Sequence, residues 1–485
     1  MSRTTSTAAV PPVTSAEEPS RRWWALALLC AAQFMVILDV TVVNVALPAI
    51  GEDLALSRSA ATWVFTAYTL CFGALLLLGG RLADTFGRRR TFLAGLAVFT
   101  TASLASGLAG SGAVLLSARA AQGVGAALLS PAALSIVTTM FHGPDRHRAL
   151  GIWAAIGGAG AAVGVLLGGA LTSGPGWEWV FFVNLPVGAL VAAATLAVVG
   201  HVPSAGGSRR IDLPGALIAG LAVGLVIYGL VEAGDGGWAA PVTLASLAGG
   251  AALLIAFVLV EHATADPLVP PALMIKRSVR AGNLVMLTAS GLLLSCFFLA
   301  SQYLQHVLAL SPFRTGLVFL PVAVAIAAGS HVGARVLGRY GGRAAAAGGF
   351  ALAAAGTLLL SRIPLDGSAV VDVLPGFALA GLGLGAVFVT ATTTALSRVD
   401  PHHAGVASGL VSTGHELGAS LGVALVSTIA GAGLDAGGAG GAASVAGFGD
   451  AFSALALVSV AAVALALWLI PAGRPAPGDG PMFAH

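Results

Sequence analysis

The sequence has little charge, and this scarcity excludes most soluble classes of protein. Only 9% of its 485 residues are charged, whereas 57% are hydrophobic and the mean hydropathy is +0.94. Soluble domains carry about 25% charged residues, so this composition indicates a membrane protein with many spans. The formal net charge of +3 is small, and the basic residues lie between apolar runs, so we expect no nucleic-acid partner.

Cysteine is also scarce, and the three cysteines, Cys30, Cys71 and Cys296, all lie inside apolar runs. Their spacing fits neither a disulfide framework nor a metal site, so we expect packed thiols and no bound metal. A phosphate-binding loop of the Walker type is lacking too. We therefore expect no nucleotide and no other cofactor, with a proton gradient as the energy source.

Long apolar runs are what the chain has in abundance. A helix needs about 20 mostly apolar residues to cross a bilayer, and a lone strand cannot satisfy its backbone in lipid. The glycine- and alanine-rich segment 431–448 fits either a loop or the continuation of a helix. We predict an all-α integral membrane protein with fourteen transmembrane helices, near residues 23–46, 60–80, 91–110, 113–140, 149–172, 179–200, 213–233, 240–260, 281–308, 314–334, 344–362, 372–396, 404–431 and 450–471.

Basic residues are distributed unevenly between the two ends of these predicted helices. If the N-terminus is cytoplasmic, clusters such as 88–90 and 209–210 also lie inside, and only Arg58, Arg314 and Arg362 lie outside. Cytoplasmic loops carry the excess of Lys and Arg, so both termini are expected in the cytoplasm. Arginine almost replaces lysine, and alanine and glycine are frequent, which suggests a GC-rich bacterial genome and a bacterial inner membrane.

A weak internal repeat divides the chain into two halves. Residues 80–90 and 334–343 are both short basic turns between two predicted helices. Repeats of this kind mark transporter folds, with the substrate site between the halves near the middle of the bilayer. We expect a disordered N-terminus over 1–22, a six-helix half over 23–200, an inserted helix pair over 201–260, a cytoplasmic linker over 261–280, a second six-helix half over 281–471 and a cytoplasmic tail over 472–485.

One acidic side chain lies deep inside the first predicted helix. Asp39 is followed by Thr41 and Asn44 on the same apolar run, which Pro48 closes. A charge at that depth costs at least a few kcal/mol, so an acid inside a membrane helix is a functional hypothesis by default.

Other acids are weaker candidates. Glu416, beside His415 in the thirteenth predicted helix, is the best second acid for binding a substrate or a proton. Its alternative role is structural, as a side chain that pairs with a polar neighbour. Asp212, Glu232 and Glu261 lie at helix ends, where we expect them to be solvated.

Three stretches together resemble signatures of the major facilitator superfamily. Residues 80–90 (Gly-Arg-Leu-Ala-Asp-Thr-Phe-Gly-Arg-Arg-Arg) resemble its loop 2–3 motif, and residues 115–125 resemble its fourth-helix motif. Residues 151–169 resemble its antiporter motif, although Val165 stands where the family has proline. The resemblance implies the major facilitator fold, with two six-helix halves that expose the substrate site to each side in turn.

The loop motif implies that Asp84 latches the two halves together in the outward-facing state. An acid beside helix N-termini and arginines can form charge-assisted bonds that hold one conformation and break in the other. A solvated basic loop that serves only topology is the alternative. The gate residues implied by the motif are Gly80, Asp84, Gly87, Arg88 and Arg89. The antiporter motif implies a groove for close helix packing, formed by Gly160, Gly164, Gly168 and Gly169.

Arg119, in the fourth-helix motif, is a guanidinium inside an apolar run. A guanidinium does not lose its proton in proteins, so its permanent charge is expected to act on a nearby acid. We expect Asp39 to be that acid. A purely structural pair between two helices is the alternative.

The stretch from Leu38 to Pro48 matches the first-helix signature of the fourteen-span drug:H+ antiporter subfamily at every defined position. Residues 177–188 resemble that subfamily's entry to the sixth helix, with Glu178 in place of the usual Arg. The resemblance implies a monomeric exporter, not an enzyme, that binds protons and hydrophobic small molecules, cations among them, within the lipid bilayer. An exporter of an endogenous metabolite, antibiotic or lipid is the first alternative, and a non-transporting receptor or membrane enzyme is a remote one.

Overall fold

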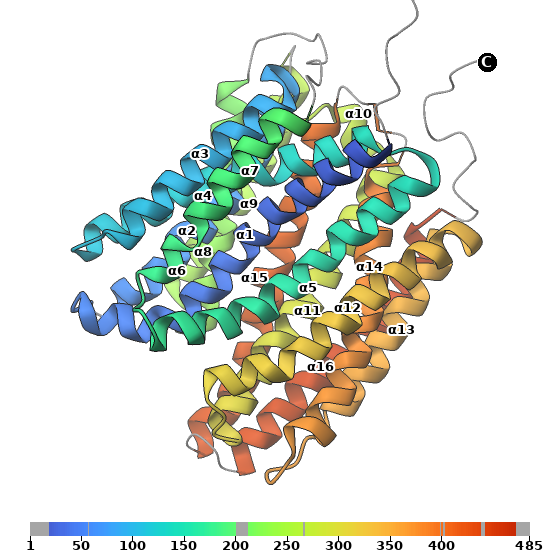
Figure 1. Ribbon diagram of the computed structural model, residues 1–485. Helices are drawn as coiled ribbons and strands as arrows, with labels where there is room; N and C mark the ends of the chain where they lie inside the picture. The colour runs from blue at the N-terminus through green and yellow to red at the C-terminus, as the bar shows by residue number, and fades with distance from the viewer. Residues whose placement is uncertain are drawn as a thin grey trace, which may run out of the picture.

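The computed structural model describes residues 19–56, 58–199, 212–264, 267–397, 399–400, 403–437 and 442–471. Within these residues the chain is helical and forms no strand. The helices gather into two groups, one from the first part of the chain in blue to green and one from the last part in yellow to red (Figure 1). The all-α class predicted from the apolar runs is therefore confirmed.

The helices follow the apolar runs because a helix satisfies every backbone group internally, as lipid requires. The first group consists of α1 (Pro19–Asp53), α2 (Arg58–Phe86), α3 (Arg88–Gly107), α4 (Gly112–Met140), α5 (Gly143–Ser173), α6 (Trp179–Phe182) and α7 (Asn184–Val198). The pair α8 (Leu213–Gly236) and α9 (Pro241–Ala263) follows. The second group consists of α10 (Pro271–Ile275), α11 (Arg277–Gln302), η1 (Tyr303–Val307), α12 (Pro312–Tyr340), α13 (Gly342–Leu360), η2 (Ala369–Val373), α14 (Leu374–Ala395), α15 (Ala404–Gly437) and α16 (Ala442–Leu469).

Each of the fourteen predicted ranges coincides with a helical stretch, and α6 and α7 share one range. In the described part of the chain, 11 helices are long and apolar enough to cross a membrane. Helices α3, α5 and α15 are not among them. The number of fourteen spans therefore stays a prediction.

The first helix begins earlier than predicted. Residues 19–22, expected to be disordered, are the first turn of α1. Arg21 stabilises this turn, because its guanidinium donates hydrogen bonds to the carbonyl oxygens of Val198 at 3.0 Å and Ala197 at 3.2 Å. The rest of the predicted N-terminal segment (1–18), residues 201–211 and the predicted tail (472–485) lie outside the described residues.

The predicted polar linker over 261–280 is largely helical and partly buried. Glu261, expected to be solvated, is only 1% exposed, because its carboxylate accepts backbone N–H bonds from Leu268 at 3.2 Å and Val269 at 2.9 Å. Both of those apolar side chains are fully buried. Asp212 is buried as well, since it caps α8 by accepting a backbone N–H bond in its first turn. The expectation of solvated acids is wrong at these two positions.

The two basic turns of the internal repeat have the same form. Gly87 joins α2 to α3 with φ 97°, and Gly341 joins α12 to α13 with φ 89°. A side chain would be strained at such a φ, so glycine allows each turn to be this short. Asp84 precedes the first glycine by three positions, and Gly338 stands at the matching position before the second.

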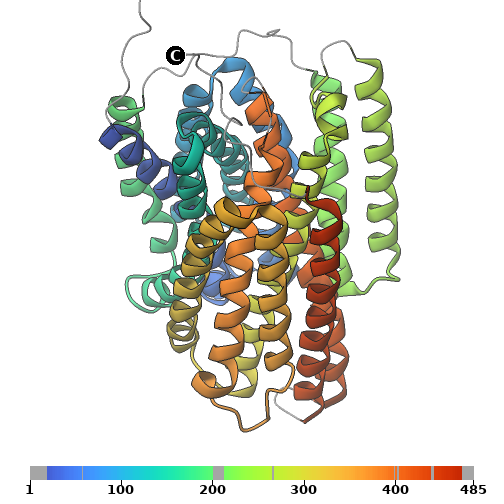
Figure 2. The ribbon, with the colours of Figure 1, turned by 90° about the vertical axis from the view of Figure 1, so that its right-hand side faces the viewer.

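The two halves meet along two seams. On the first seam α5 packs between α1 and α12, which Figure 1 shows at the boundary of the two groups. On the second seam α2 packs against α15. Helix α8 lies against both α2 and α15, and α9 packs on α8 at the periphery (Figure 2). The α8–α9 pair thus covers the α2–α15 seam.

The described residues of the segment 431–448 are helical, so the helix was the right one of the two alternatives. α15 continues to Gly437 and α16 begins at Ala442, while residues 438–441 lie outside the described residues.

Candidate functional site

A buried ion pair joins α1 to α4. Arg119 Nη1 lies 2.5 Å from Asp39 Oδ2, and both side chains are fully buried. The expected contact between these two residues is therefore present. Each charge depends on the other, because a buried charge left without its partner costs several kcal/mol.

The second carboxylate oxygen of Asp39 is held by two amides. Gln122 Nε2 donates to Asp39 Oδ1 at 2.7 Å, and Asn184 Nδ2 donates to the same oxygen at 3.1 Å. Both amides also donate to Ser103 Oγ, which itself donates to the carbonyl oxygen of Phe181 at 3.0 Å. The hydrogen bonds around the carboxylate, with Ser103 included, thus link α1, α3, α4 and α7.

The sequence alone assigned no role to Gln122, Asn184 or Ser103. A signal was available, since each is a polar side chain inside a predicted membrane helix, where polar groups pair with one another. Gln122 is also one helical turn from Arg119, and its Oε1 accepts a hydrogen bond from Arg119 Nη1 at 2.7 Å.

The Arg119 guanidinium is enclosed by aromatic rings and acceptors. Its Nε donates to the carbonyl oxygen of Val64 at 3.1 Å, and its Cζ lies 4.5 Å from the centre of the Tyr68 ring. The Phe181 ring lies on another side at 5.7 Å. A desolvated cation over an aromatic face gains about 2 kcal/mol, so the rings help to hold the charge in this apolar place.

Glu416, the predicted second acid, lies on α15 in the other half of the chain. Its side chain is 22% exposed, and its Oε1 lies 3.2 Å from His415 Nδ1. A Cβ on Gly73 of α2 would lie 3.9 Å from the Glu416 Cβ, so Glu416 borders α2. Asp39 is therefore enclosed in the first half, whereas Glu416 is partly accessible on α15 of the second half.

The antiporter-motif glycines of α5 pack against α1, the helix that carries Asp39. A Cβ atom on Gly160 would lie 2.7 Å from Ile37, and one on Gly164 would overlap the Thr41 hydroxyl. Thr41 is itself hydrogen-bonded to the Leu38 carbonyl oxygen at 2.9 Å. Two predicted motifs, one on α1 and one on α5, are thus packed face to face.

The remaining motif glycines extend this contact in two directions. Gly168 faces Val42 of α1, whereas a Cβ on Gly169 would lie 3.6 Å from the backbone of Phe313 on α12. Helix α5 therefore contacts both halves through neighbouring glycines. Asn44 and Pro48 lie in the helical part of α1, and their side chains are outside the description.

Replacing Gly164 with alanine should destabilise the protein by about 1–3 kcal/mol, because the new methyl group overpacks the α1–α5 contact. Thermal unfolding of the purified protein measures this loss. Gly338→Ala is the matched control, since that exposed helical glycine on α12 has no atom within 4 Å of a new Cβ. Equal unfolding temperatures for the two variants would contradict the close packing.

The predicted gate residue Asp84 bridges the two halves. Its carboxylate accepts backbone N–H bonds from Gly405 at 2.9 Å and Val406 at 3.0 Å, at the N-terminus of α15. A Cβ on Gly80 would overlap the Gly405 carbonyl oxygen, so glycine is needed for this approach of α2 to α15. We call Asp84, Gly405 and Val406 the Asp84 latch.

The arginines of the basic turn have different partners. Arg88 Nη2 lies 3.6 Å from Asp84 Oδ1. Burial lowers the pKa of the Arg88 guanidinium, and the nearby Asp84 carboxylate opposes this shift. Arg89 instead donates to the Leu196 carbonyl oxygen at 2.8 Å, at the end of α7. The structure therefore brings Arg88, but not Arg89, to the Asp84 latch.

Replacing Asp84 with asparagine should loosen the N-terminus of α15. The amide keeps one acceptor oxygen, but its NH2 group faces the second backbone N–H and cannot accept from it. That backbone N–H therefore loses a hydrogen bond to a charged group, which is worth about 1.5–3 kcal/mol. Hydrogen exchange at the Gly405 and Val406 amides is then expected to accelerate by about tenfold or more, since 1.4 kcal/mol is a factor of ten. Asp366→Asn, at an exposed position, should leave these rates unchanged. Unaltered exchange in the Asp84 variant would show that the latch does not stabilise this contact.

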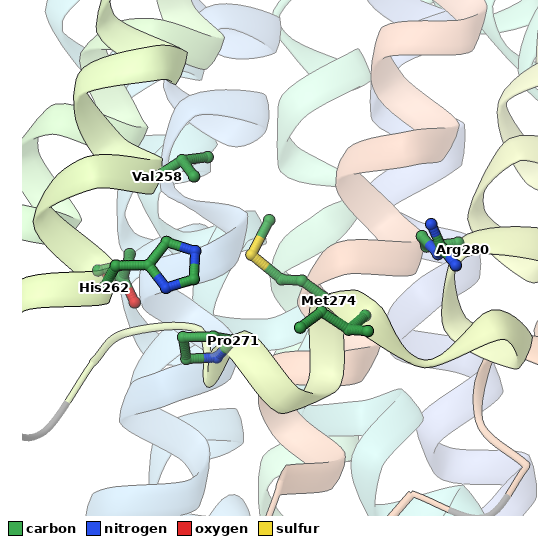
Figure 3. Close-up of a pocket in the computed structure, with 7 residues that line it drawn as sticks. Val258, His262, Pro271, Met274 and Arg280 are labelled. Carbon is green, nitrogen blue, oxygen red and sulfur yellow. The ribbon is translucent and has the colours of Figure 1, made fainter.

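A small cavity of about 150 Å³ lies apart from these residues, between the end of α9, α10 and the start of α11 (Figure 3). The side chains of His262 and Met274 point towards each other in it, and none of the predicted site residues lines it. Among the described residues no three His, Cys, Asp or Glu side chains are grouped closely enough to hold a metal ion.

Comparison with known proteins gives a consistent picture. The sequence profile described as the Major Facilitator Superfamily matches residues 29–423. The chain is 43% identical to the puromycin resistance protein pur8 of Streptomyces alboniger, over 88% of this chain and 86% of that protein. It is 40% identical to the cephamycin export protein CmcT of Amycolatopsis lactamdurans, over 92% of each chain. It is 33% identical to the tetracenomycin C resistance and export protein of Streptomyces glaucescens, over 84% of this chain and 76% of that protein.

Solved structures show the same fold. The human organic anion transporter MFSD10 superposes with a TM-score of 0.66 at 16% identity, over 93% of this chain and 100% of that chain. The proton:xylose symporter XylE superposes with a TM-score of 0.65 at 15% identity, over 95% of this chain and 98% of that chain. At such identities the likeness concerns the fold alone. The predicted fold is confirmed.

Proposed function

The chain belongs to the Major Facilitator Superfamily, and from that premise we propose that it is a proton-coupled exporter of hydrophobic small molecules, cations among them. Membership of this family makes it a multi-pass membrane transporter of small molecules and not an enzyme. Its relatives are named for resistance to antibiotics or for their export, which supports the outward direction.

The buried Asp39–Arg119 pair carries the proposal of proton coupling. Binding of a proton to Asp39 removes the negative charge that holds the donors of Arg119, Gln122 and Asn184. These donors come from α4 and α7, so protonation changes the forces between α1 and its neighbours. The enclosed carboxylate can exchange its proton only when the helices move, which links proton exchange to the conformational change.

Glu416 has the features of a substrate-binding acid. It is partly exposed, it lies on α15 of the second half, and its neighbour His415 contacts the Phe388 ring at 5.9 Å. A carboxylate beside an aromatic side chain suits a lipophilic cation, which needs a counter-charge and an apolar surface. In this proposal Asp39 carries the proton and Glu416 meets the substrate.

The remaining parts of the proposal concern topology. The chain is assigned to the fourteen-span drug:H+ antiporter subfamily, with both termini in the cytoplasm of a bacterial cell, and it acts as a monomer. The α8–α9 pair, outside the two six-helix halves, supports this assignment. The Asp84 latch lies at the end of the molecule that carries the basic turns, so it closes the cytoplasmic side in the outward-facing state.

A second candidate is the export of an antibiotic or another metabolite made by the same cell. The names of the puromycin, cephamycin and tetracenomycin C proteins favour it. It shares the mechanism and differs only in substrate. Genes for the synthesis of such a compound beside the gene for this chain would distinguish it from a general drug exporter.

A susceptibility panel tests the proposed function. The chain is expressed in an efflux-deficient bacterial host, which is exposed to puromycin, a cephamycin, tetracenomycin C and lipophilic cationic dyes. We expect higher inhibitory concentrations for some of these compounds, and we expect the protection to vanish when a protonophore collapses the proton gradient. Protection that survives the protonophore would refute proton coupling, and no protection at all would refute export of these classes.

A further inference from the structure

Helix α8 approaches α2 closely at the side of the molecule. A Cβ on Gly220 would lie 3.1 Å from the Ala74 carbonyl oxygen, and one on Gly224 would lie 3.6 Å from the Ala74 Cβ. These glycines bring the α8 backbone against α2, as small residues do between membrane helices. Helix α8 also contacts α15.

Ile227 of α8 occupies a notch formed by the missing side chain of Gly73 on α2. A Cβ on Gly73 would overlap Ile227 Cδ1, and the same point lies 3.9 Å from the Cβ of Glu416 on α15. Ile227 is only 1% exposed. Residues of α2, α8 and α15 therefore meet at this notch, and the partly exposed Glu416 borders it.

Helix α8 packs against α2 and α15 at this notch, and its other sides are apolar or covered by α9. The outward positions of α8 are apolar, with Leu217 58% and Leu221 61% exposed. Helix α9 packs on α8, and its own outer side chains, such as Ile255 and Leu259, are exposed. The outer side of the α8–α9 pair therefore has the apolar character of a lipid-facing surface, and Ile227, on the inner side of α8, is packed at the notch beside Glu416.

Two further contacts, both C-terminal to Ile227, attach α8 and the turn after it to the two halves. Tyr228 stacks on Trp63 of α2, with ring centres 5.9 Å apart. Trp238, in the turn after α8, donates from Nε1 to Thr428 Oγ1 of α15 at 2.9 Å. Because α8 contacts both halves, a movement of one half relative to the other must change its contacts with α2, with α15 or with both.

We propose that Gly73, Ile227 and Glu416 form a side entrance, through which lipophilic cations pass from the bilayer to Glu416, with Ile227 as the side chain that closes it. The substrate class rests on the proposed export function, whereas the closure by Ile227 rests on the packing alone. An amphiphile entering here keeps its apolar body in lipid until its charge meets the carboxylate. Membrane helices are held by van der Waals packing, which lipid tails replace when Ile227 leaves its notch.

Carbodiimide labelling of Glu416 tests the entrance without any need for transport. Dicyclohexylcarbodiimide reaches carboxyl groups from lipid, whereas a water-soluble carbodiimide reaches them from water. Labelling of the Glu416 peptide in proteoliposomes is followed by mass spectrometry, with Glu416→Gln as the unlabelled reference. We expect Gly73→Ala to raise the rate of labelling by the lipophilic reagent severalfold, because the new methyl group displaces Ile227, and to leave labelling from water unchanged.

A second substitution makes the test specific to this contact. Ile227→Val removes only the Cδ1 atom that the Gly73→Ala methyl group would overlap, so the double variant should regain the slow labelling of the wild type. Leu221→Ala, on the lipid-facing side of the same helix, should not alter the rate. Each variant is first compared with the wild type by thermal unfolding, so that a misfolded protein is recognised.

Equal labelling rates in the wild type and Gly73→Ala would overturn the entrance, and so would a rise confined to the water-soluble reagent. Failure of Ile227→Val to restore slow labelling in the double variant would overturn the role of Ile227. None of these outcomes depends on the susceptibility panel, so an error in the proposed function would leave them interpretable.

Discussion

Replacing Asp39 with asparagine is expected to abolish substrate-driven proton flux. The asparagine amide keeps one acceptor oxygen but turns an N–H donor towards the donors that the second carboxylate oxygen served, and it cannot take up and release a proton at neutral pH. Proteoliposomes that contain a pH-sensitive dye report the flux when substrate is added. Movement of substrate down its own gradient is expected to persist in the variant, because the transport path itself is not blocked.

Two comparisons make this experiment decisive. Asp145→Asn removes an acid whose partner is Arg22 and whose side chain is 28% exposed, far from the membrane interior, so its proton flux should equal that of the wild type. Full coupled transport by the Asp39 variant would refute the role of Asp39 in proton coupling. Loss of flux in both variants would point to a general defect and not to the site.

Replacing Arg119 with methionine is expected to lower the free energy of unfolding by about 3–5 kcal/mol, because the fully buried Asp39 carboxylate loses its counter-charge. The double variant Asp39→Asn, Arg119→Met should regain most of this loss. Replacing a whole buried pair by uncharged groups of similar volume is often neutral, whereas removing one partner is not. Thermal or denaturant unfolding in detergent measures all three variants.

The two single variants and the double variant form a double-mutant cycle, which separates the interaction energy of the pair from the effects of the single side chains. If the losses of the two single variants simply add in the double variant, the pair contributes nothing beyond its separate packing, and the electrostatic account of the site is wrong. A stable but uncoupled double variant is the result that separates the structural role of the pair from its role in transport.

The Asp39–Arg119 pair could be predicted because apolar runs leave a buried charge very few partners. Asn184 and Ser103 could not be assigned to it in the same way. Whether two polar side chains on different helices meet depends on how each helix is rotated, and an apolar sequence with a weak periodicity does not fix that rotation. The site therefore has more donors around the carboxylate than the sequence indicated.

Contacts between segments far apart in the sequence could be predicted only where a motif indicated them. The loop motif implied a role for Asp84, but its donor Gly405 lies 321 positions further along the chain, and no local pattern connects the two. For Glu261 the local sequence gave a definite prediction, and that prediction was wrong. Its place at a helix end suggested water, whereas the chain folds back and offers two backbone N–H groups to its carboxylate.

The unequal turns of the internal repeat have a mechanical consequence. Asp84 fastens the end of α2 to α15, but Gly338, at the matching position on α12, offers no such bond to α5. The α5–α12 seam is instead packed through glycines, with Gly316 against Leu166 and Gly169 against Phe313. Breaking the Asp84 contact therefore removes a polar attachment from the α2–α15 seam and leaves the packing of the α5–α12 seam in place. We expect the two halves to separate first along the α2–α15 seam, which the α8–α9 pair covers, with the α5–α12 seam as the pivot.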